Sequence, residues 1–274
     1  MAWTHDLGWL GMCFSLLSGA HIAAAAGATQ DFGLRADLLR LSQRRIFFGH
    51  QSVGMNLLDG VRQIAGRYPE VALHVVETSD AGELAPGTFA HGFMPENGDP
   101  ERKLESFERV LSSGIGVAAD VAFIKFCYTD FSAATDVPAL FARYQATLRA
   151  LHARYPRTIF VHVTTPLTTV EGGAKSTLKR LLGRTPNGVL ENAKREHFNE
   201  LLRSAYLGKK PVFDLARLES SAPDGHREIF AWKGTQVPAL LSSYTEDGGH
   251  LTPDARVRFA RELIALLASL PQAQ

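Results

Sequence analysis

Short apolar runs recur along the chain, separated by longer stretches in which the apolar residues are spaced differently. Five runs are rich in β-branched or aromatic residues, which is typical of the buried strands of a parallel sheet. These runs cover 45–49, 71–77, 121–126, 158–164 and 211–215. The stretches between them repeat apolar residues every three or four positions, which predicts helices that bury one face. These stretches cover 55–67, 104–111, 137–155, 190–206 and 253–270. The alternation predicts an α/β fold, a three-layer α/β/α sandwich with a mainly parallel five-stranded sheet.

Two long polar stretches interrupt this alternation, at 79–99 and 168–188. Loops of this length inside a domain are usually functional or disordered. The second stretch carries four basic side chains, Lys175, Lys179, Arg180 and Arg184. Its pattern fits a lid or a short helix. We favour a solvated charged surface over a binding site for an anionic substrate, because surface charges are usually solvated.

The first 28 residues predict a secretory signal peptide. Residues 7–26 are almost uncharged and end in Ala26-Gly27-Ala28, an A-x-A pattern typical of a cleavage site. No Lys or Arg precedes Arg35, so a retained membrane anchor and a buried helix stay open as alternatives. We expect a single domain over 29–274, located in the periplasm or outside the cell, with no stable membrane insertion after cleavage.

Composition excludes several classes of protein. The chain has 29 Lys and Arg against 28 Asp and Glu, a net charge of +1, so we expect no nucleic-acid partner. Its two cysteines, Cys13 and Cys127, exclude a disulfide framework and a cysteine-based zinc site, and we expect Cys127 in the core. The ten histidines show no ligand spacing such as H-E-x-x-H, so we expect neither a metal nor an organic cofactor.

Polar residues gather where the predicted strands end, which is the edge of a parallel sheet at which ligands bind. The first strand continues into His50-Gln51-Ser52-Val53-Gly54, and a helix follows directly. A serine at such a turn exposes its hydroxyl, and the N–H groups at the start of the helix favour an anionic intermediate. The alternative is that Ser52 only caps the helix.

Two further polar clusters belong to the same predicted edge. They are Cys127-Tyr128-Thr129-Asp130 after the third strand and Asp247-Gly248-Gly249-His250 before the last helix. An aspartate three residues before a histidine can hold the imidazole tautomer for a nearby hydroxyl. Each cluster alone has a simpler explanation, Asp130 as a cap and the Asp-Gly pair as a surface turn. Their placement together with Ser52 indicates nucleophilic catalysis.

This arrangement resembles the SGNH/GDSL hydrolase superfamily from Arg45 to the final helix. In that superfamily the nucleophilic serine follows the first strand in a Gly-Asp-Ser block, and a D-x-x-H block precedes the last helix. The resemblance implies that Ser52 is the nucleophile, His250 the general base and Asp247 its orienting partner. It also implies the flavodoxin-like fold of the superfamily. Three later segments resemble family elements as well, at 162–168, 192–203 and 212–215.

The chain departs from the family pattern beside the nucleophile and at the groups that would bind the oxyanion. His50-Gln51 stands where the family has Gly-Asp, and Thr129 takes the place of the family's oxyanion asparagine. Losing one such donor typically costs about 3–4 kcal/mol of transition-state stabilisation. The departures imply replaced donors, a slow enzyme or a degenerate site.

Several groups are candidates for the replacement donors. The resemblance assigns backbone N–H groups of Ser52 and of Gly82, the glycine nearest to the family's second block. Tyr128 or Gln51 is a candidate for the missing side-chain donor. His50 has no family role, and it would either help to bind substrate or cap the turn.

These observations together predict a serine esterase that removes O-acyl groups, with acetyl groups on a carbohydrate favoured, through an acyl-serine intermediate. Its partner would be a small-molecule or polysaccharide ester. Two alternatives stay open. The same triad would serve a polysaccharide O-acetyltransferase if water were excluded, and the missing family residues are compatible with a catalytically degenerate carbohydrate-binding protein.

Overall fold

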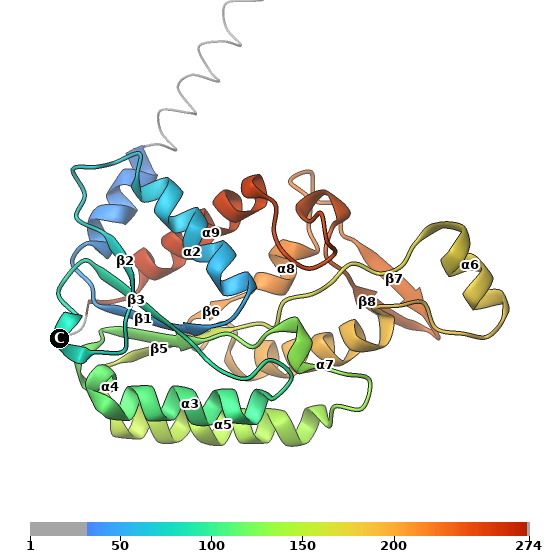
Figure 1. Cartoon of the computed structure of the whole chain (residues 1–274), viewed down its shortest axis with the longest axis horizontal. Helices are drawn as coiled ribbons and strands as arrows, with labels where there is room; N and C mark the ends of the chain where they lie inside the picture. The colour runs from blue at the N-terminus through green and yellow to red at the C-terminus, as the bar shows by residue number, and fades with distance from the viewer. Residues whose placement is uncertain (1–31, 273–274) are drawn as a thin grey trace, which may run out of the picture.

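A six-stranded parallel sheet forms the middle layer of the computed structural model, which describes residues 32–272 (Figure 1). Its strands are β1 (Ile46–His50), β2 (His74–Glu77), β3 (Thr88–Phe93), β4 (Val121–Ile124), β5 (Ile159–Val163) and β6 (Val212–Phe213). They lie in the order β2-β3-β1-β4-β5-β6, and every neighbouring pair is parallel. Helices cover both faces, so the predicted three-layer α/β/α sandwich is confirmed.

The sheet has one strand more than the sequence predicts. The additional strand, β3, lies inside the stretch 79–99 that the sequence predicts as a polar loop, and that prediction is wrong for residues 88–93. Two polar side chains, Thr88 and His91, interrupt the apolar pattern of this strand, although both are buried. β3 pairs with β1 on one side and with β2 on the other, so β2 forms an edge of the sheet.

The first strand shows how the sequence divides its side chains between two cores. Ile46 and Phe48 belong to one core and Phe47 to the other, as the two-residue period of a strand requires. All three side chains are fully buried. A central strand that is apolar on both faces is stable only when helices cover both of them.

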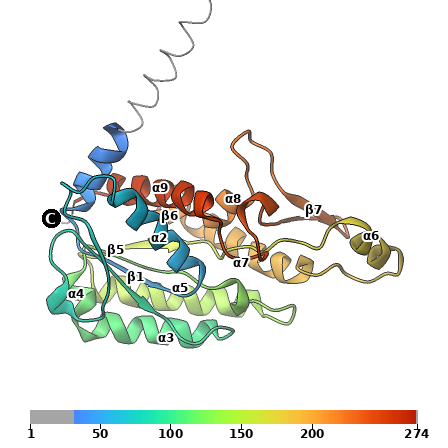
Figure 2. The ribbon, with the colours of Figure 1, turned by 45° about the horizontal axis from the view of Figure 1, so that its top comes forward.

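One face of the sheet is covered by α2 (Val53–Ala65) and α9 (Pro253–Ser269), together with the short α8 (Leu215–Glu219) and a helix over 32–41. Figure 2 shows α2 and α9 in the same layer. Gly60 lets these two helices approach closely, because a Cβ atom at this position would lie 2.2 Å from the carbonyl oxygen of Arg256. The helix predicted over 253–270 is α9, and it begins at Pro253 after the N-cap residue Thr252.

The opposite face is covered by α3 (Pro100–Val110), α5 (Val137–Arg154) and α7 (Val189–Tyr206). The Phe198 ring of α7 packs edge-on against Phe126, Phe131 and Phe141, at centroid distances of 5.4–5.5 Å. This aromatic cluster joins α7 and α5 to the segment that follows β4. Segments that are distant in the sequence are thereby fixed beside the carboxyl end of the sheet.

An arm extends from the end of the molecule at which the strands finish (Figures 1 and 2). It consists of α6 (Gly173–Leu181) and the hairpin formed by β7 (Ile229–Trp232) and β8 (Thr235–Pro238). The stretch 168–188 therefore contains a short helix, one of the two structures that its pattern fits. The remaining short helical segments are η1 (Ala81–Glu83), η2 (Leu111–Ile115), α4 (Gly116–Ala118), η3 (Tyr128–Asp130) and η4 (Ser242–Tyr244).

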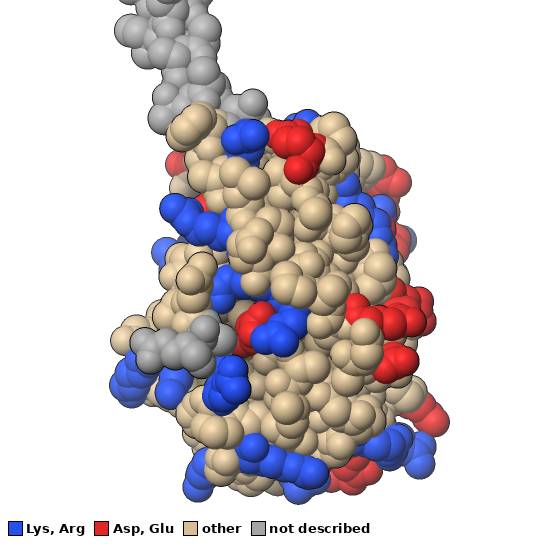
Figure 3. All heavy atoms as spheres, turned by 90° about the vertical axis from the view of Figure 1, so that its left-hand side faces the viewer, with Lys and Arg blue, Asp and Glu red and all other residues tan. Residues whose placement is uncertain are grey.

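Charges of both signs are interspersed on the end of the molecule opposite the arm, which Figure 3 shows, in keeping with the net charge of +1. At the start of the sheet, Arg45 and Asp120 form an ion pair with an N–O distance of 2.6 Å. Between residues 32 and 272, no helix combines the length and the apolar character needed to cross a membrane.

Two sequence predictions concern the N-terminus. The signal peptide predicted over 1–28 lies outside the described residues, and so does Cys13. Cys127 is described, and its side chain is buried in the core, as the sequence predicts.

Candidate active site

The central strand β1 lies where the direction of chain winding reverses. α2 leads from β1 to β2 and β3 over one face of the sheet, and α3 leads from β3 to β4 over the other. In open α/β sheets, ligands bind outside the carboxyl ends of the strands at this point. Ser52 follows β1 here, and Tyr128 follows the neighbouring strand β4.

Ser52 occupies a strained turn between β1 and α2. Its φ of 48° and ψ of −105° are unusual for a residue with a side chain, and such a conformation costs on the order of 1–3 kcal/mol. Although Ser52 is the N-cap residue of α2, its hydroxyl makes no capping hydrogen bond. The hydroxyl instead lies 2.5 Å from Nε2 of His250, which is 198 residues away in the sequence.

Gly54 explains how the chain can turn this tightly after β1. A Cβ atom at Gly54 would lie 2.4 Å from the Cβ of His50. Only glycine therefore allows the first turn of α2 to pack against the His50 side chain. This contact fixes the direction in which α2 leaves the strand and hence the position of Ser52 between them.

The loop before α9 supplies the histidine and its carboxylate partner. Nδ1 of His250 lies 2.5 Å from Oδ2 of Asp247, and Oδ1 of Asp247 accepts hydrogen bonds from the N–H groups of His250 and Gly249. These hydrogen bonds, first that from the His250 backbone, hold the pKa of Asp247 well below its usual range. Asp247 is therefore ionised at neutral pH and can stabilise a protonated imidazole. Both side chains remain open to solvent, with 41% of His250 and 55% of Asp247 exposed.

Asn56 ties α2 to the histidine loop, and the sequence reasoning missed this contact. Its buried side-chain oxygen accepts a hydrogen bond of 2.9 Å from the N–H of Leu251, directly after His250. The distance between α2 and the loop is thereby set by one polar contact. The available signal was an amide side chain on the helix face that also carries the apolar residues Val53, Leu57 and Gly60.

Tyr128 closes the site on the side of β4. Burial raises the pKa of its phenol, and a hydrogen bond with Ser52 partly offsets this rise, so the hydroxyl keeps its proton at neutral pH. The ring packs edge-on against the His250 ring, at a centroid distance of 5.9 Å. A Cβ atom at Gly249 would lie 2.9 Å from the Tyr128 ring, so glycine is needed for this approach.

A buried arginine on α7 holds the Tyr128 segment in place. Nε of Arg195 donates to the carbonyl oxygen of Tyr128 at 3.0 Å, and Nη1 donates to the Thr168 hydroxyl at 2.9 Å. The guanidinium also lies 5.9 Å from the centre of the Tyr128 ring. Sequence reasoning missed Arg195, because it lies among other charged residues of α7 and nothing in that pattern marks it as buried.

Gln51 and Asp130 have supporting positions. Nε2 of Gln51 donates to the carbonyl oxygen of Met94 and so joins the chain after β1 to the chain after β3. Asp130 forms a fully buried ion pair of 2.7 Å with Lys103 and accepts the N–H of Cys127. It therefore caps its own turn, η3, and not the segment that follows, as the simpler sequence explanation had it.

Thr129 and Tyr128 line different cavities. The Thr129 side chain is exposed, and it lines a cavity shared with Asp99, Ser132 and Ala139 on the α3 and α5 side. The structure thus gives the asparagine-equivalent position no role beside Ser52, whereas Tyr128, one residue earlier, lies at the hydroxyl.

The prediction that Gly82 lies beside Ser52 is wrong. The chain after β2 runs back along the sheet, so Gly82 in η1 lies near η2, at the end where the strands begin. Its N–H donates to Asp80 at 2.8 Å. The error follows from the missed strand β3, because β3 and not β2 adjoins β1.

His50 cannot contact substrate, because its side chain is fully buried. Its Nε2 lies 3.1 Å from Nδ1 of His91, and Nε2 of His91 lies 3.1 Å from a guanidinium nitrogen of Arg62. Burial lowers the pKa of His50 to about 2 and that of His91 to about 4, so both rings are neutral at physiological pH. The expected substrate-binding role of His50 is therefore wrong.

A polar cavity of about 390 Å³ has Asp247 in its lining, but not Ser52 or His250. Its lining includes Tyr128 and Asp247 together with Thr169, Glu171 and Asn187 at the base of the arm. The N–H of Thr169 donates to the carbonyl oxygen of Gly248, which anchors the arm to the histidine loop. Within 32–272, no cluster of His, Cys, Asp and Glu suited to a metal ion is present.

The N–H of Ser52 is a candidate donor to an anion. Across the part of the chain that the structure describes, it donates no hydrogen bond to another protein group. It lies at the start of α2, where N–H groups favour negative charge. Together with the Tyr128 hydroxyl, it gives the site two donors next to the Ser52 oxygen.

Neither a protein-family model nor a curated protein sequence matches the chain. Among solved structures, the chain is similar to a GDSL-like lipase from Bacteroides thetaiotaomicron at 13% identity and a TM-score of 0.49, covering 84% of this chain and 90% of that one. It is also similar to a Bacteroides fragilis protein assigned as an acylhydrolase, at 14% identity and a TM-score of 0.48, covering 82% and 88%. A third similar structure is a variant of an acetyl esterase, at 13% identity and a TM-score of 0.41, covering 81% and 93%.

The first of these proteins carries the name of the superfamily that the sequence motifs resemble. All three TM-scores lie below 0.5 and all three identities below 25%.

Proposed function

We propose that the chain is a serine hydrolase of the SGNH type, which cleaves O-acyl esters through an acyl-Ser52 intermediate. The observation that carries this proposal is the continuous chain of contacts from Asp247 through His250 to the Ser52 hydroxyl, with both distances at 2.5 Å. Ser52 is held in a strained turn and makes no cap hydrogen bond, as expected of a nucleophile rather than a helix cap.

In the first step, Nε2 of His250 takes the proton of the Ser52 hydroxyl as its oxygen attacks the ester carbonyl. The carbonyl π electrons move to its oxygen and give a tetrahedral oxyanion. Asp247 stabilises the imidazolium that forms. When the oxyanion collapses, the bond to the alcohol breaks, and His250 returns the proton to the departing alcohol.

The second step repeats this chemistry with water. His250 takes a proton from water, whose oxygen attacks the acyl carbon, and the acid departs as Ser52 regains its proton. The Ser52 N–H and the Tyr128 hydroxyl are the proposed donors to the oxyanion in both steps. Tyr128 thus replaces the asparagine of the family, and Gly82 and Thr129 have no part in this proposal.

Hydrolysis is favoured over acyl transfer by the exposure of the triad. About two fifths of His250 and more than half of Asp247 face solvent, whereas transfer needs a site that keeps water away from the acyl-enzyme. The polar cavity beside Tyr128 supports a polyhydroxyl alcohol as the leaving group, so an acetylated carbohydrate remains the proposed substrate. An assembled triad favours an enzyme over a binding protein.

The proposal is tested with a fluorophosphonate label and with p-nitrophenyl acetate. We expect the label on Ser52 and hydrolysis of the ester. Ser52→Ala should abolish labelling and lower the rate on the order of 10⁴–10⁶-fold. Ser113→Ala is the matched control, because Ser113 is an exposed serine whose hydroxyl only bonds the Val110 carbonyl. Labelling that persists in the folded Ser52→Ala variant would contradict the proposal.

A further inference from the structure

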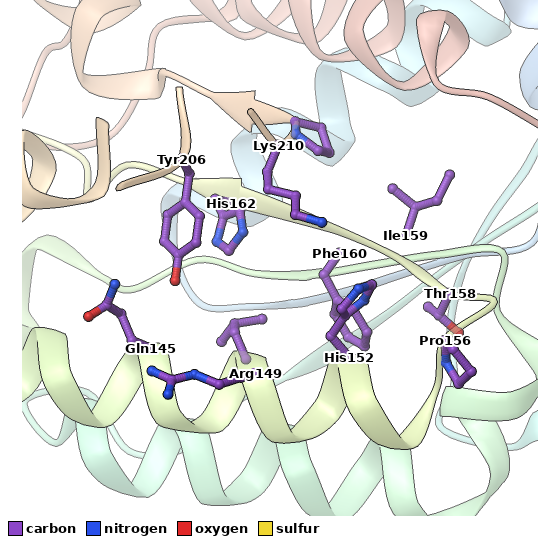
Figure 4. Close-up of a pocket in the computed structure, with 12 residues that line it drawn as sticks. Gln145, Arg149, His152, Pro156, Thr158, Ile159, Phe160, His162, Tyr206 and Lys210 are labelled. Atoms are coloured by element: carbon purple, nitrogen blue, oxygen red, sulfur yellow. The ribbon is translucent and has the colours of Figure 1, made fainter. Parts of the chain in front are cut away.

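A third cavity lies along β5, between this strand, α5 and the segment that joins α7 to β6 (Figure 4). Its volume is about 410 Å³. Ile159 at the start of β5 is in register, through Val121, with Ile46 at the start of β1. With a rise of about 3.3 Å per residue, this end of the sheet is roughly 20 Å from Ser52. A molecule at the Ile159 end of this cavity would lie about 20 Å from Ser52, and no residue that lines the cavity belongs to the proposed triad.

The walls of this cavity carry basic side chains and no carboxylate. Arg149 and His152 come from α5, and Lys210 comes from the segment after α7. Figure 4 shows Lys210 on one side of the cavity and Arg149 on the other. In the described part of the chain, neither of these two cations forms an ion pair, whereas the nearby Arg143 of α5 pairs with Glu108. Both side chains are solvent-exposed, and the cavity thus has two positive charges without a carboxylate partner in its lining.

One wall of the cavity is a stacked pair of rings. The Tyr206 ring lies parallel to the His162 imidazole, at a centroid distance of 3.6 Å and an angle of 10°. Only 5% of His162 is exposed, and its Nδ1 lies 2.8 Å from the Tyr144 hydroxyl. Burial lowers the pKa of His162 to about 4, so the ring is neutral. When Tyr144 donates to Nδ1, the proton resides on Nε2, which becomes a further donor at the wall.

The open edge of β5 adds a main-chain donor. β6 pairs with β5 only at His162 and Val163, and the His162 N–H donates to the carbonyl oxygen of Pro211. Alternate residues of a strand direct their N–H groups to the same side. The Phe160 N–H is therefore directed to this edge, at a point where β6 has not begun, and Phe160 itself lines the cavity.

We propose that this cavity is a binding site for a small aromatic carboxylate. The carboxylate would lie between Arg149 and Lys210, where the planar guanidinium can donate two parallel hydrogen bonds. The ring would pack against Tyr206 and Phe160. The volume suits a ligand of this size, and a mostly apolar wall with a few convergent polar groups is typical of small-molecule sites. This site is separate from the proposed hydrolase chemistry and uses none of its residues.

Isothermal titration calorimetry with benzoate tests the proposal, with benzamide as the uncharged ligand of the same shape. We expect benzoate to bind at least tenfold more tightly than benzamide, because only the carboxylate neutralises the two cations. Arg149→Gln and Lys210→Gln should each weaken benzoate binding about tenfold. Tyr206→Leu should weaken both ligands several-fold through loss of the ring contact.

Two matched controls locate the binding. Lys209→Gln changes the neighbouring lysine, whose ammonium lies against the carbonyl oxygens of Ser204 and Ala205 outside the cavity, and it should leave the affinity unchanged. Ser52→Ala should also leave it unchanged, because no triad residue lines the cavity. Thermal unfolding of each variant shows that it is folded, and in the NMR spectrum benzoate should shift the imidazole signals of His162.

Four results would overturn the proposal. They are the absence of benzoate binding at millimolar concentration, equal affinity for benzamide, unchanged affinity in both Arg149→Gln and Lys210→Gln, and loss of binding in Ser52→Ala. The last result would place benzoate at the triad. Because the controls do not depend on catalysis, a failure here leaves the proposed hydrolase activity untouched, and an inactive enzyme leaves this test intact.

Discussion

His50 precedes Ser52 in the sequence and His250 follows it. The two side chains differ in burial and in the group that each one contacts. His50 is two residues before the serine, is fully buried and has another imidazole, that of His91, as its partner. His250 is 198 residues after the serine, is 41% exposed and has the carboxylate of Asp247 beside it. Burial lowers the pKa of His50 to about 2, so this ring cannot accept a proton at neutral pH.

The difference shows what an imidazole needs in order to act as a base. It needs a carboxylate that stabilises its protonated form, and it needs an opening through which substrate reaches the nucleophile. His250 has both, and His50 has neither. Proximity to the serine in the sequence is thus no guide to the proposed catalytic partner. The D-x-x-H spacing already favours His250, and the fold brings its ring to the Ser52 hydroxyl.

The largest expected effect comes from substituting each of the two histidines separately. His250→Ala should lower kcat with p-nitrophenyl acetate on the order of 10⁴–10⁶-fold and leave the unfolding temperature close to that of the wild type, because the ring is half-exposed. His50→Gln should have the reverse pattern, with a lower unfolding temperature and a rate within about tenfold of the wild type, because a buried hydrogen bond is lost. Equal losses of activity in both folded variants would contradict the proposal that His250 acts as the base and that His50 does not.

The two aspartates of the site sharpen the same contrast. Asp247→Asn should lower kcat about 10⁴-fold, since the amide cannot stabilise the imidazolium, with little change in stability. Asp130→Asn leaves the buried Lys103 without its ion-pair partner, and it should lower the free energy of unfolding by about 3 kcal/mol. Urea unfolding and esterase assays on both variants test the expected changes in stability and in activity. A stable, inactive Asp130→Asn variant would show that Asp130 acts in the chemistry.

A smaller effect is expected at Tyr128. Tyr128→Phe removes a donor beside the Ser52 oxygen and should lower kcat about 10²–10³-fold with little change in KM. Thr129→Ala is the matched control at the next residue and should change kcat less than threefold, because its side chain lines a different cavity. If Thr129→Ala were the more damaging change, the oxyanion donor would have been assigned to the wrong residue.

The smallest effect concerns the dependence of stability on pH. The pKa of His91 is about 4 in the folded protein, below its ordinary value of 6.5, so between these values the unfolded chain binds a proton that the folded chain does not. Stability should therefore be complete above pH 6.5 and fall as the pH decreases toward 4. His91→Gln should reduce this fall, measured as the unfolding temperature at pH 7 and pH 4.5, and exchange of the exposed His74 for Gln should leave it unchanged.

The sequence predicted more of the fold than of the site. Runs such as 121–126 are apolar on both faces, and that pattern is sufficient to place a central strand. β3 was missed because Thr88 and His91 are polar and yet buried, and their burial depends on neighbours that no local pattern shows. The misplacement of Gly82 followed from that omission, since the position of a loop depends on which strands are neighbours.

The sequence by itself determined the residue types and the local turns of this protein. The D-x-x-H spacing brings a carboxylate to an imidazole within one loop, and Gly54 permits a serine at a sharp turn after β1. Only the tertiary structure decided which groups meet across the sheet, including Ser52 with His250, Tyr128 in place of Thr129, and Asn56 with the histidine loop. The physical reason is that hydrogen bonds within a few residues follow from backbone geometry, whereas contacts between distant segments depend on strand order and on how closely helices such as α2 and α9 can pack.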